Sequence, residues 1–147
     1  MNERYETFTL LIAKISRSIR RLQNQEMADY GLRSAHITCL HYLYLHDGLT
    51  ATDLCDRCEE DKATISRALA QLEKDGYITC EVHGSKRYKA PLLLTEKGKA
   101  AGQRIADKID RVLDDVSVGL TEDERIAFYR SLTIICDRLD DLAAHRS

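Results

Sequence analysis

The spacing of apolar residues changes from a helical to an extended pattern at Gly76, and this change limits the folds open to the chain. Before Gly76, the stretch ISRALAQL repeats its apolar residues every three or four positions, as a helix with one buried face does. After it, YITCEV and RYKAPLLLT are strand-like and are separated by HGSK, whose Gly84-Ser85 pair is typical of a turn. We therefore expect a helix that leads directly into a β-hairpin.

Two further short helices are expected before this helix and hairpin. Ser34 is a suitable N-cap for one of them, HITCLHYLYL, which ends near Asp47. Thr50 begins the next, ATDLCDRC, and Asp53 three residues later comes close to a capping box. Asp61 is a suitable N-cap for the helix that follows. Three short helices followed by a two-stranded hairpin form a winged helix-turn-helix.

Long amphipathic helices are expected at both ends of the chain. Residues 4–29 carry apolar side chains at helical spacing and are followed by Gly31, which ends the helix. Residues 95–120 and a last helix from Thr121 show the same pattern. One small domain cannot bury all these apolar faces, so we expect a second copy of the chain to cover them. The expected fold is mainly α with a small β-hairpin wing, flanked by N- and C-terminal dimerisation helices.

The charge distribution indicates an anionic partner for one part of the chain. The net charge is −2, which by itself gives no sign of nucleic-acid binding. Residues 62–90, however, hold six basic and three acidic residues, whereas residues 47–61 hold six acidic residues and one arginine. A basic patch on an acidic protein is typical of a surface that meets a partner.

The outer face of the helix after Asp61 has the chemistry that a DNA major groove requires. Arg67 can bond the O6 and N7 atoms of guanine, and Thr64 and Ser66 can bond base edges or phosphates. A solvated helix face or a solvated turn would explain either basic cluster alone, but both together favour DNA. The predicted DNA-binding residues are Lys62, Ala63, Thr64, Ser66, Arg67, Gln71, Lys86, Arg87, Lys89 and Ser34.

The run LTATDLCDRCEEDKATISRALAQLEKDGYI, the basic hairpin and LLLTEKGKA resemble the MarR family of bacterial transcriptional regulators. The resemblance covers the middle half of the chain closely, and the terminal helices match in length and position. It implies a homodimer on a palindromic operator, in which Arg67 reads bases, Thr64 and Ser66 contact the operator, and Arg87 enters the minor groove. The tip HGSKRYKA departs from the family because it lacks the acid that orients the wing arginine.

We therefore expect a single domain over residues 1–147, with a winged-helix DNA-binding lobe at 34–98 and dimerisation helices at 1–30 and 100–147. The expected function is that of a sequence-specific DNA-binding transcriptional regulator, a dimeric repressor released by a small-molecule effector. Two alternatives stay open: a winged-helix protein-interaction module and a thiol-based redox-sensing regulator.

The second helix carries candidate residues for an effector pocket. In the family, small aromatic ligands often bind between the dimerisation helices and the DNA-binding lobe. The resemblance therefore implies a phenolic or other aromatic effector beside His36, His41 and Tyr44. The competing interpretation is that Tyr44 packs in the core and that the histidines are partly exposed surface groups.

The five cysteines are expected to be thiols. Cys55 and Cys58 form one C-x-x-C pair without the second pair that zinc usually requires, so we predict no metal site. We expect Cys55 in the core and Cys58 partly exposed, with redox sensing as the alternative. The remaining three lie at apolar-face positions and are expected to pack; they are Cys39, Cys80 and Cys136. The cysteine that some relatives use to sense peroxide, in the first helix, is missing here.

No catalytic motif is recognisable, because the sequence lacks G-x-S-x-G, H-E-x-x-H and a P-loop. We therefore predict no enzymatic activity and no cofactor. No apolar run approaches the roughly 20 residues that span a bilayer. The N-terminus has acidic residues before its apolar part and basic residues after it, the reverse of a secretory signal. These features predict a cytoplasmic protein without a membrane partner.

Overall fold

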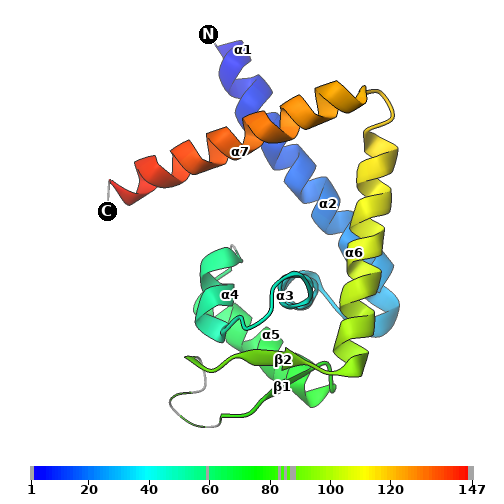
Figure 1. The fold of residues 1–147 in the computed structure, drawn as a ribbon, viewed down its shortest axis with the longest axis vertical. Coiled ribbons are helices and arrows are strands. Elements are labelled where there is room, and N and C mark those ends of the chain that lie inside the picture. The colour runs from blue at the N-terminus through cyan, green and yellow to red at the C-terminus, as the bar shows by residue number, and fades with distance from the viewer. Residues whose placement is uncertain (1, 59, 83, 85, 87–88, 146–147) are drawn as a thin grey trace. The chain divides into compact units, whose positions relative to one another are not determined.

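The structure of the chain is a computed structural model that describes residues 2–58, 60–82, 84, 86 and 89–145. The chain divides into two compact units, Met1–Ile109 and Asp110–Ser147. The described residues are mainly helical, and they include one two-stranded antiparallel sheet (Figure 1). The predicted fold class, mainly α with a small β-hairpin wing, is therefore confirmed.

The chain begins with a nearly continuous helical segment. It consists of α1 (Asn2–Tyr5), a π-helical turn η1 (Glu6–Leu10), α2 (Leu11–Met27) and a 3₁₀ turn η2 (Ala28–Tyr30). Gly31 follows with φ of 70°, a left-handed conformation that glycine adopts without steric cost. The predicted long first helix and its termination at Gly31 are confirmed.

Helix α3 (Ser34–Leu45) begins one residue earlier than predicted. Ser34 was predicted to be the N-cap, but it is the first helical residue, and Arg33 occupies the cap position in an extended conformation. The hydroxyl of Ser34 is used elsewhere: it accepts from Asn24 Nδ2 at 3.0 Å and donates to Asn24 Oδ1 at 3.2 Å. The amide of Arg33 instead donates to Nδ1 of His36 at 3.2 Å. A partner on α2, invisible in the local sequence, therefore decides the start of α3.

Helices α4 (Ala51–Arg57) and α5 (Lys62–Lys74) begin at the predicted caps. The Thr50 amide donates to Asp53 Oδ2 at 2.8 Å, and the Asp53 amide donates to Thr50 Oγ1 at 3.1 Å, which completes a capping box. Asp61 Oδ1 accepts from the amide of Thr64 at 2.6 Å. These hydrogen bonds satisfy helix-start donors that would otherwise lack partners.

Strands β1 (Ile78–Cys80) and β2 (Leu92–Leu94) form the hairpin, and both are shorter than the sequence pattern suggested. They pair antiparallel, with Ile78 opposite Leu94 and Cys80 opposite Leu92. Strand β2 starts directly after Pro91, which has no amide hydrogen to donate to a ladder. The Leu92 amide donates to the carbonyl of Leu49 at 2.9 Å, which joins the segment before α4 to the hairpin.

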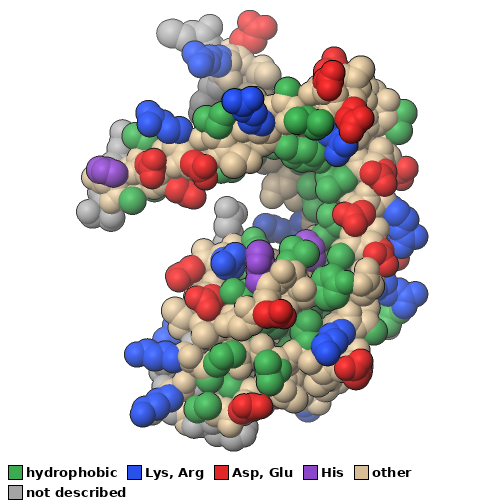
Figure 2. Space-filling model, in the orientation of Figure 1, with side chains coloured by type: hydrophobic (Ala, Val, Ile, Leu, Met, Phe, Trp, Pro, Cys, Tyr) green, Lys and Arg blue, Asp and Glu red, His purple; other side chains and the backbone are tan. Residues whose placement is uncertain are grey.

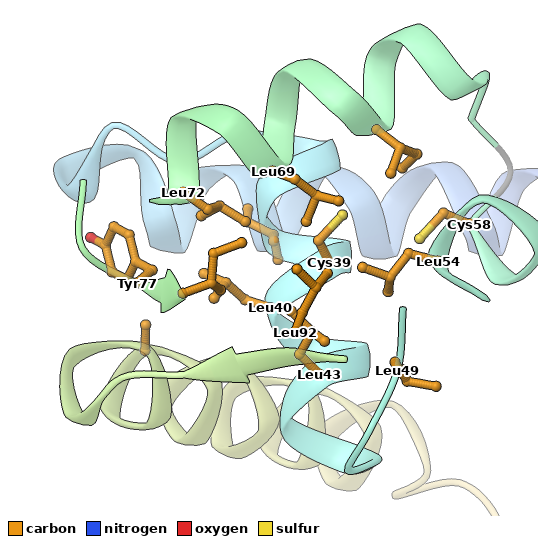
Figure 3. Close-up of a cluster of buried hydrophobic side chains, with 14 of the residues drawn as sticks. Cys39, Leu40, Leu43, Leu49, Leu54, Cys58, Leu69, Leu72, Tyr77 and Leu92 are labelled. Carbon is orange, nitrogen blue, oxygen red and sulfur yellow. The ribbon is translucent and has the colours of Figure 1, made fainter. Parts of the chain in front are cut away.

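The core of the first unit lies between α3, α4, α5 and the hairpin (Figure 3). No polar or charged residue among those described is buried. The predicted apolar stripe of α5 is confirmed, since Ile65, Ala68, Leu69 and Leu72 are all buried. Ile65, Leu69 and Leu72 pack with buried residues of α3, among them Ile37, Leu40 and Leu43. This packing fixes α5 by one side and leaves its other side in solvent.

Helix α6 (Glu96–Val116) approaches the winged helix through two glycines. A Cβ atom at Gly98 would overlap the carbonyl oxygen of Tyr77, and one at Gly102 would come within 2.6 Å of the Cβ of Tyr44. Thr95 caps the helix, with its Oγ1 accepting from the Gly98 amide at 3.0 Å. The glycines therefore allow α6 to contact the Tyr77 backbone and the Tyr44 side chain more closely than any side chain at these positions would permit.

Helix α7 (Glu122–Ala144), in the second unit, has no buried residue although its sequence is amphipathic. The helix starts at Thr121 as expected, and a capping box forms there: the Thr121 amide donates to Glu124 Oε2 at 2.8 Å, and the Glu124 amide donates to Thr121 Oγ1 at 3.2 Å. Large apolar side chains are exposed on α7 and also along the N-terminal helical segment. The exposed residues are Phe8, Leu10, Leu11, Ile12, Ile15, Leu22, Ile126, Phe128, Tyr129, Ile134, Leu139 and Leu142. None of the helices that the structure describes has the length and apolar character to cross a lipid bilayer.

The cysteines of α4 are arranged in the reverse of the prediction. Cys58 is buried and Cys55 is only partly buried, because Cys58 follows the last turn of α4 and points to Cys39 of α3. Hydrogen bonding between the two thiols raises the pKa of Cys39 and lowers that of Cys58. Cys39 and Cys80 are buried as expected, whereas Cys136 is exposed on α7. Within the described residues no cluster of His, Cys, Asp or Glu is arranged to hold a metal ion.

We predict that Gly98→Ala destabilises the protein by about 1–3 kcal/mol, because the new methyl group forces α6 away from the Tyr77 carbonyl. Urea unfolding followed by circular dichroism measures the loss. Gly119→Ala is the matched control, since a Cβ there meets no atom within 4 Å. Equal stability of the two variants would contradict the close packing of α6.

A second prediction concerns acid sensitivity of the α5 cap. Hydrogen bonds from the backbone and side chain of Thr64 hold the pKa of Asp61 below its usual value. A carboxylate with a depressed folded-state pKa stabilises the fold above its unfolded pKa of about 3.9, and this contribution disappears as pH falls through the folded-state value.

Asp61→Asn keeps an acceptor but does not titrate, so its unfolding free energy should fall less steeply between about pH 5 and pH 2 than that of the parent. Urea titrations at four pH values give both curves. Parallel curves would show that the Asp61 carboxylate does not contribute.

Candidate nucleic-acid interface

Helix α5 presents one polar face, and this face contains most of the predicted DNA-binding residues. Its buried stripe turns toward α3, so the remaining positions of the helix reach solvent. Thr64 is half-buried at the boundary, as the helical spacing predicts. The exposed residues of this face are Lys62, Ala63, Ser66, Arg67, Ala70 and Gln71. Small side chains alternate with the larger polar ones, so nothing bulky holds the helix backbone away from a groove.

Arg67 lies at the centre of this face and is partly oriented by its neighbour. Its Nη2 donates to Thr64 Oγ1 at 3.3 Å, one helical turn earlier. A guanidinium group has five N–H donors in a planar fork, so one bond to Thr64 leaves an edge available for an acceptor pair. Guanine O6 and N7 form such a pair in the major groove.

The start of α5 is occupied by the protein's own carboxylate. Asp61 accepts from the Thr64 amide, and its pKa is also lowered by a hydrogen bond from the Ala63 backbone. A helix start with free amides would attract a phosphate. Here the negatively charged carboxylate of Asp61 already occupies the helix start, so phosphate contacts must come from side chains.

Gln71 is exposed on the predicted face, but its amide is engaged. Its Nε2 donates to both carboxylate oxygens of Asp75, at 3.0 and 2.9 Å. The Asp75 carbonyl in turn accepts from Lys97 Nζ at 2.7 Å, and this ammonium group lies 4.3 Å from the centre of the Tyr77 ring. Reading an adenine with Gln71 would require the amide to leave Asp75.

The hairpin places basic residues at a second position. Lys86 and Lys89 are exposed, and the Lys89 amide donates to the carbonyl of Lys86 at 3.2 Å. Figure 2 shows basic side chains at the end of the winged helix that carries the hairpin. Arg87, the predicted minor-groove residue, lies outside the described residues. Ser34, also predicted to contact DNA, is half-buried and holds Asn24, so it joins α2 to α3.

The three predicted effector residues all lie on α3 and are partly buried. Burial lowers the pKa of His36, an effect that the nearby Asp75 charge opposes. The Tyr44 hydroxyl donates to Gln103 Oε1 of α6, and its ring packs against Gly102. In the structure, His36 accepts a hydrogen bond at the start of α3, and Tyr44 joins α3 to α6. His41 is half-buried on the same helix.

Sequence reasoning missed one basic surface of the same unit. Arg17, Arg20 and Arg21 are exposed on α2, which was assigned only to dimerisation. The available signal was the absence of any acidic residue between positions 7 and 25, which hold four basic ones.

Comparison with known proteins identifies relatives of this chain. Residues 30–87 match the model of the MarR family. The HTH-type transcriptional repressor YetL of Bacillus subtilis is 26% identical over 136 residues, which cover 88% of this chain and 79% of that protein.

Two solved structures extend the likeness over most of the fold. A MarR-family transcriptional regulator from Silicibacter pomeroyi is 30% identical, with a TM-score of 0.75, and the match covers 85% of this chain and 84% of that one. A putative MarR-family regulator from Listeria monocytogenes, complexed with a 26mer DNA, is 24% identical, with a TM-score of 0.80 and coverage of 91% and 89%. The chain belongs to the MarR family of winged-helix transcriptional regulators.

Proposed function

We propose that this regulator binds a palindromic DNA operator as a homodimer and represses transcription by occupying it. The observation that carries the proposal is the solvent-facing side of α5, where Arg67 and the hydroxyls of Thr64 and Ser66 surround small alanines. Side chains of this kind on a rigidly packed second helix of a helix-turn-helix suit base recognition in the major groove. As a member of a family of regulators, the chain acts by binding and not by catalysis.

Each proposed contact has a distinct task. Arg67 supplies the base-reading fork, whereas Lys62, Lys86 and Lys89 supply charge to the phosphate backbone. The Listeria relative was crystallised in complex with a 26mer DNA, which supports DNA binding here. Arg87 would add a minor-groove contact from the hairpin.

The exposed apolar residues of the terminal helices support dimerisation. Monomeric proteins rarely leave so many large apolar side chains in water, and α7 buries none of its residues within the single chain. A two-fold dimer would cover these residues and present two copies of α5. Two recognition helices of a dimer read half-sites about 10 base pairs apart, or a multiple of the helical turn.

Repression and release by a small molecule complete the proposal. The repressor YetL, a relative over most of the chain, supports repression as the direction of control. A phenolic or other aromatic effector bound beside α3, near His36, His41 and Tyr44, would act on the contact of Tyr44 with α6. Titration of an operator complex with phenolic acids tests this part, and unchanged affinity for DNA would contradict it.

We predict that Arg67→Ala weakens binding to the preferred operator by roughly 1–3 kcal/mol and relaxes sequence preference, because the fork to guanine is lost. Selection of bound sequences from random DNA defines the operator, and fluorescence anisotropy then gives the dissociation constants.

Arg67→Lys keeps the charge but not the fork, so it should lose selectivity while retaining affinity for random DNA. Lys99→Ala, an exposed charge on α6, is the matched control and should behave as the parent does. Parent-like selectivity of Arg67→Ala would show that α5 is not the reading helix.

A further prediction tests the dimer. Leu139→Glu on α7 and Ile15→Glu on α2, made separately, should each weaken dimerisation by more than about 1.4 kcal/mol, or tenfold, because a carboxylate would be desolvated at the interface. Analytical ultracentrifugation measures the dimer constant. Ala127→Glu is the control, because it adds the same charge to α7 at an exposed position without a large apolar side chain. A parent protein that stays monomeric at micromolar concentration would disprove the dimer itself.

A further inference from the structure

The side of α2 opposite its apolar residues is basic, and the surface that α5 presents does not explain it. Residues 7–25 hold four basic and no acidic residues in a chain of net charge −2. Arg17, Arg20 and Arg21 are exposed. With about 100° of rotation for each residue, all three point at least a quarter turn away from Ile15 and Leu22. A dimer formed through the apolar side would therefore leave these arginines accessible.

The three arginines line a shallow surface hollow on α2, and a second hollow continues it toward α3. The first is formed by Arg17, Arg20, Arg21, Asn24, Gln25 and Ala28. The second shares two of these residues and is formed by Asn24, Ala28, Gly31, Leu32 and Arg33. Together they form what we call the arginine strip, which runs from Arg17 to Arg33.

The arginine strip belongs to the same packed unit as the recognition helix. Asn24 makes two hydrogen bonds to Ser34, and Met27 and Leu32 are buried in the core that contains the α5 stripe. Its position relative to α5 is therefore fixed by packing. Its far end is formed by Arg33, which is exposed at the cap position of α3.

We propose that the arginine strip binds the phosphate backbone of the operator outside the base pairs that α5 reads. This inference rests on the proposed DNA binding. Arginine forks fit phosphate oxygens in pairs, and neighbouring arginines without acidic residues repel one another until an anion neutralises them. From Arg17 to Arg21 the helix rises by about 6 Å, which corresponds to roughly two base pairs of duplex, and Arg33 lies at the far end of the second hollow. Separate phosphates of one strand can meet the arginines at both ends, whereas a single small anion would engage only one end.

The contact would be independent of sequence, because phosphates are the same at every step. It would lengthen the DNA that each subunit protects and add to the salt dependence of binding. Specificity would remain with α5, since the arginine strip would strengthen binding to all sequences alike.

The test uses two duplexes that share one selected operator. The short duplex ends at the operator, and the long duplex adds about one helical turn, roughly 10 base pairs, on each side. Arg17→Gln/Arg20→Gln/Arg21→Gln is compared with the parent. Arg125→Gln/Arg130→Gln/Arg138→Gln on α7 removes equal charge from three exposed arginines and serves as the control. Affinities are measured across a salt series, and ultracentrifugation gives the oligomeric state of each protein.

We expect the parent to show a steeper dependence of log affinity on log salt with the long duplex. Each lost phosphate contact removes about 0.9 from this slope, so six missing arginines in a dimer should lower it by roughly 3–5 on the long duplex and leave the short one unchanged. The α7 control should match the parent on both.

Equal slopes for parent and variant on the long duplex would overturn the proposal, as would an equal loss on both duplexes. Dissociation of the variant into monomers would also overturn it, because the arginines would then belong to the subunit interface. Failure of the proposed DNA binding looks different: the parent would bind neither duplex. If the parent binds both duplexes and prefers the operator, but the arginine substitutions have no effect, the proposed function stands and only this inference is refuted.

Discussion

Burial of one side of α5 against α3 determines what the winged helix shows to its surroundings. Ile65, Leu69 and Leu72 can enter the core only if the helix is turned with Arg67 outward. The orientation therefore requires no free energy beyond that of folding, and the proposed reading surface exists before any DNA binds. Pre-organisation of this kind preserves binding energy that ordering a loop would consume.

The same core connects the functional surfaces to each other. Helix α3 packs against α5 through its buried residues, against α6 through Tyr44, and against α2 through the Ser34 and Asn24 bonds. A ligand that disturbed any of these contacts would have a route to α5 that requires no loop motion. The glycines of α6 make this packing close, which leaves little room for gradual adjustment.

Sequence alone was sufficient for the features that depend on neighbouring residues. The α5 stripe, the Thr50 and Asp53 box and the change of pattern at Gly76 are all local, so helical periodicity and cap chemistry predicted them. Features that depend on distant partners were missed or reversed. The Ser34 hydroxyl bonds Asn24 instead of capping α3, and the burial of Cys58 depends on Cys39 across the core. The basic run of α2 is present in the sequence, but its exposure is not, and the apolar pattern of that helix predicts dimerisation.

The bond between Gln71 and Asp75 has a consequence for the genome that such a regulator serves. An amide that must first abandon a carboxylate gains less from meeting an adenine than a side chain that begins unpaired. In the proposed complex, base pairs facing Gln71 would accordingly tolerate more sequence variation between the promoters under common control than those facing Arg67. One regulator could then recruit new target genes over evolutionary time without changing its own sequence.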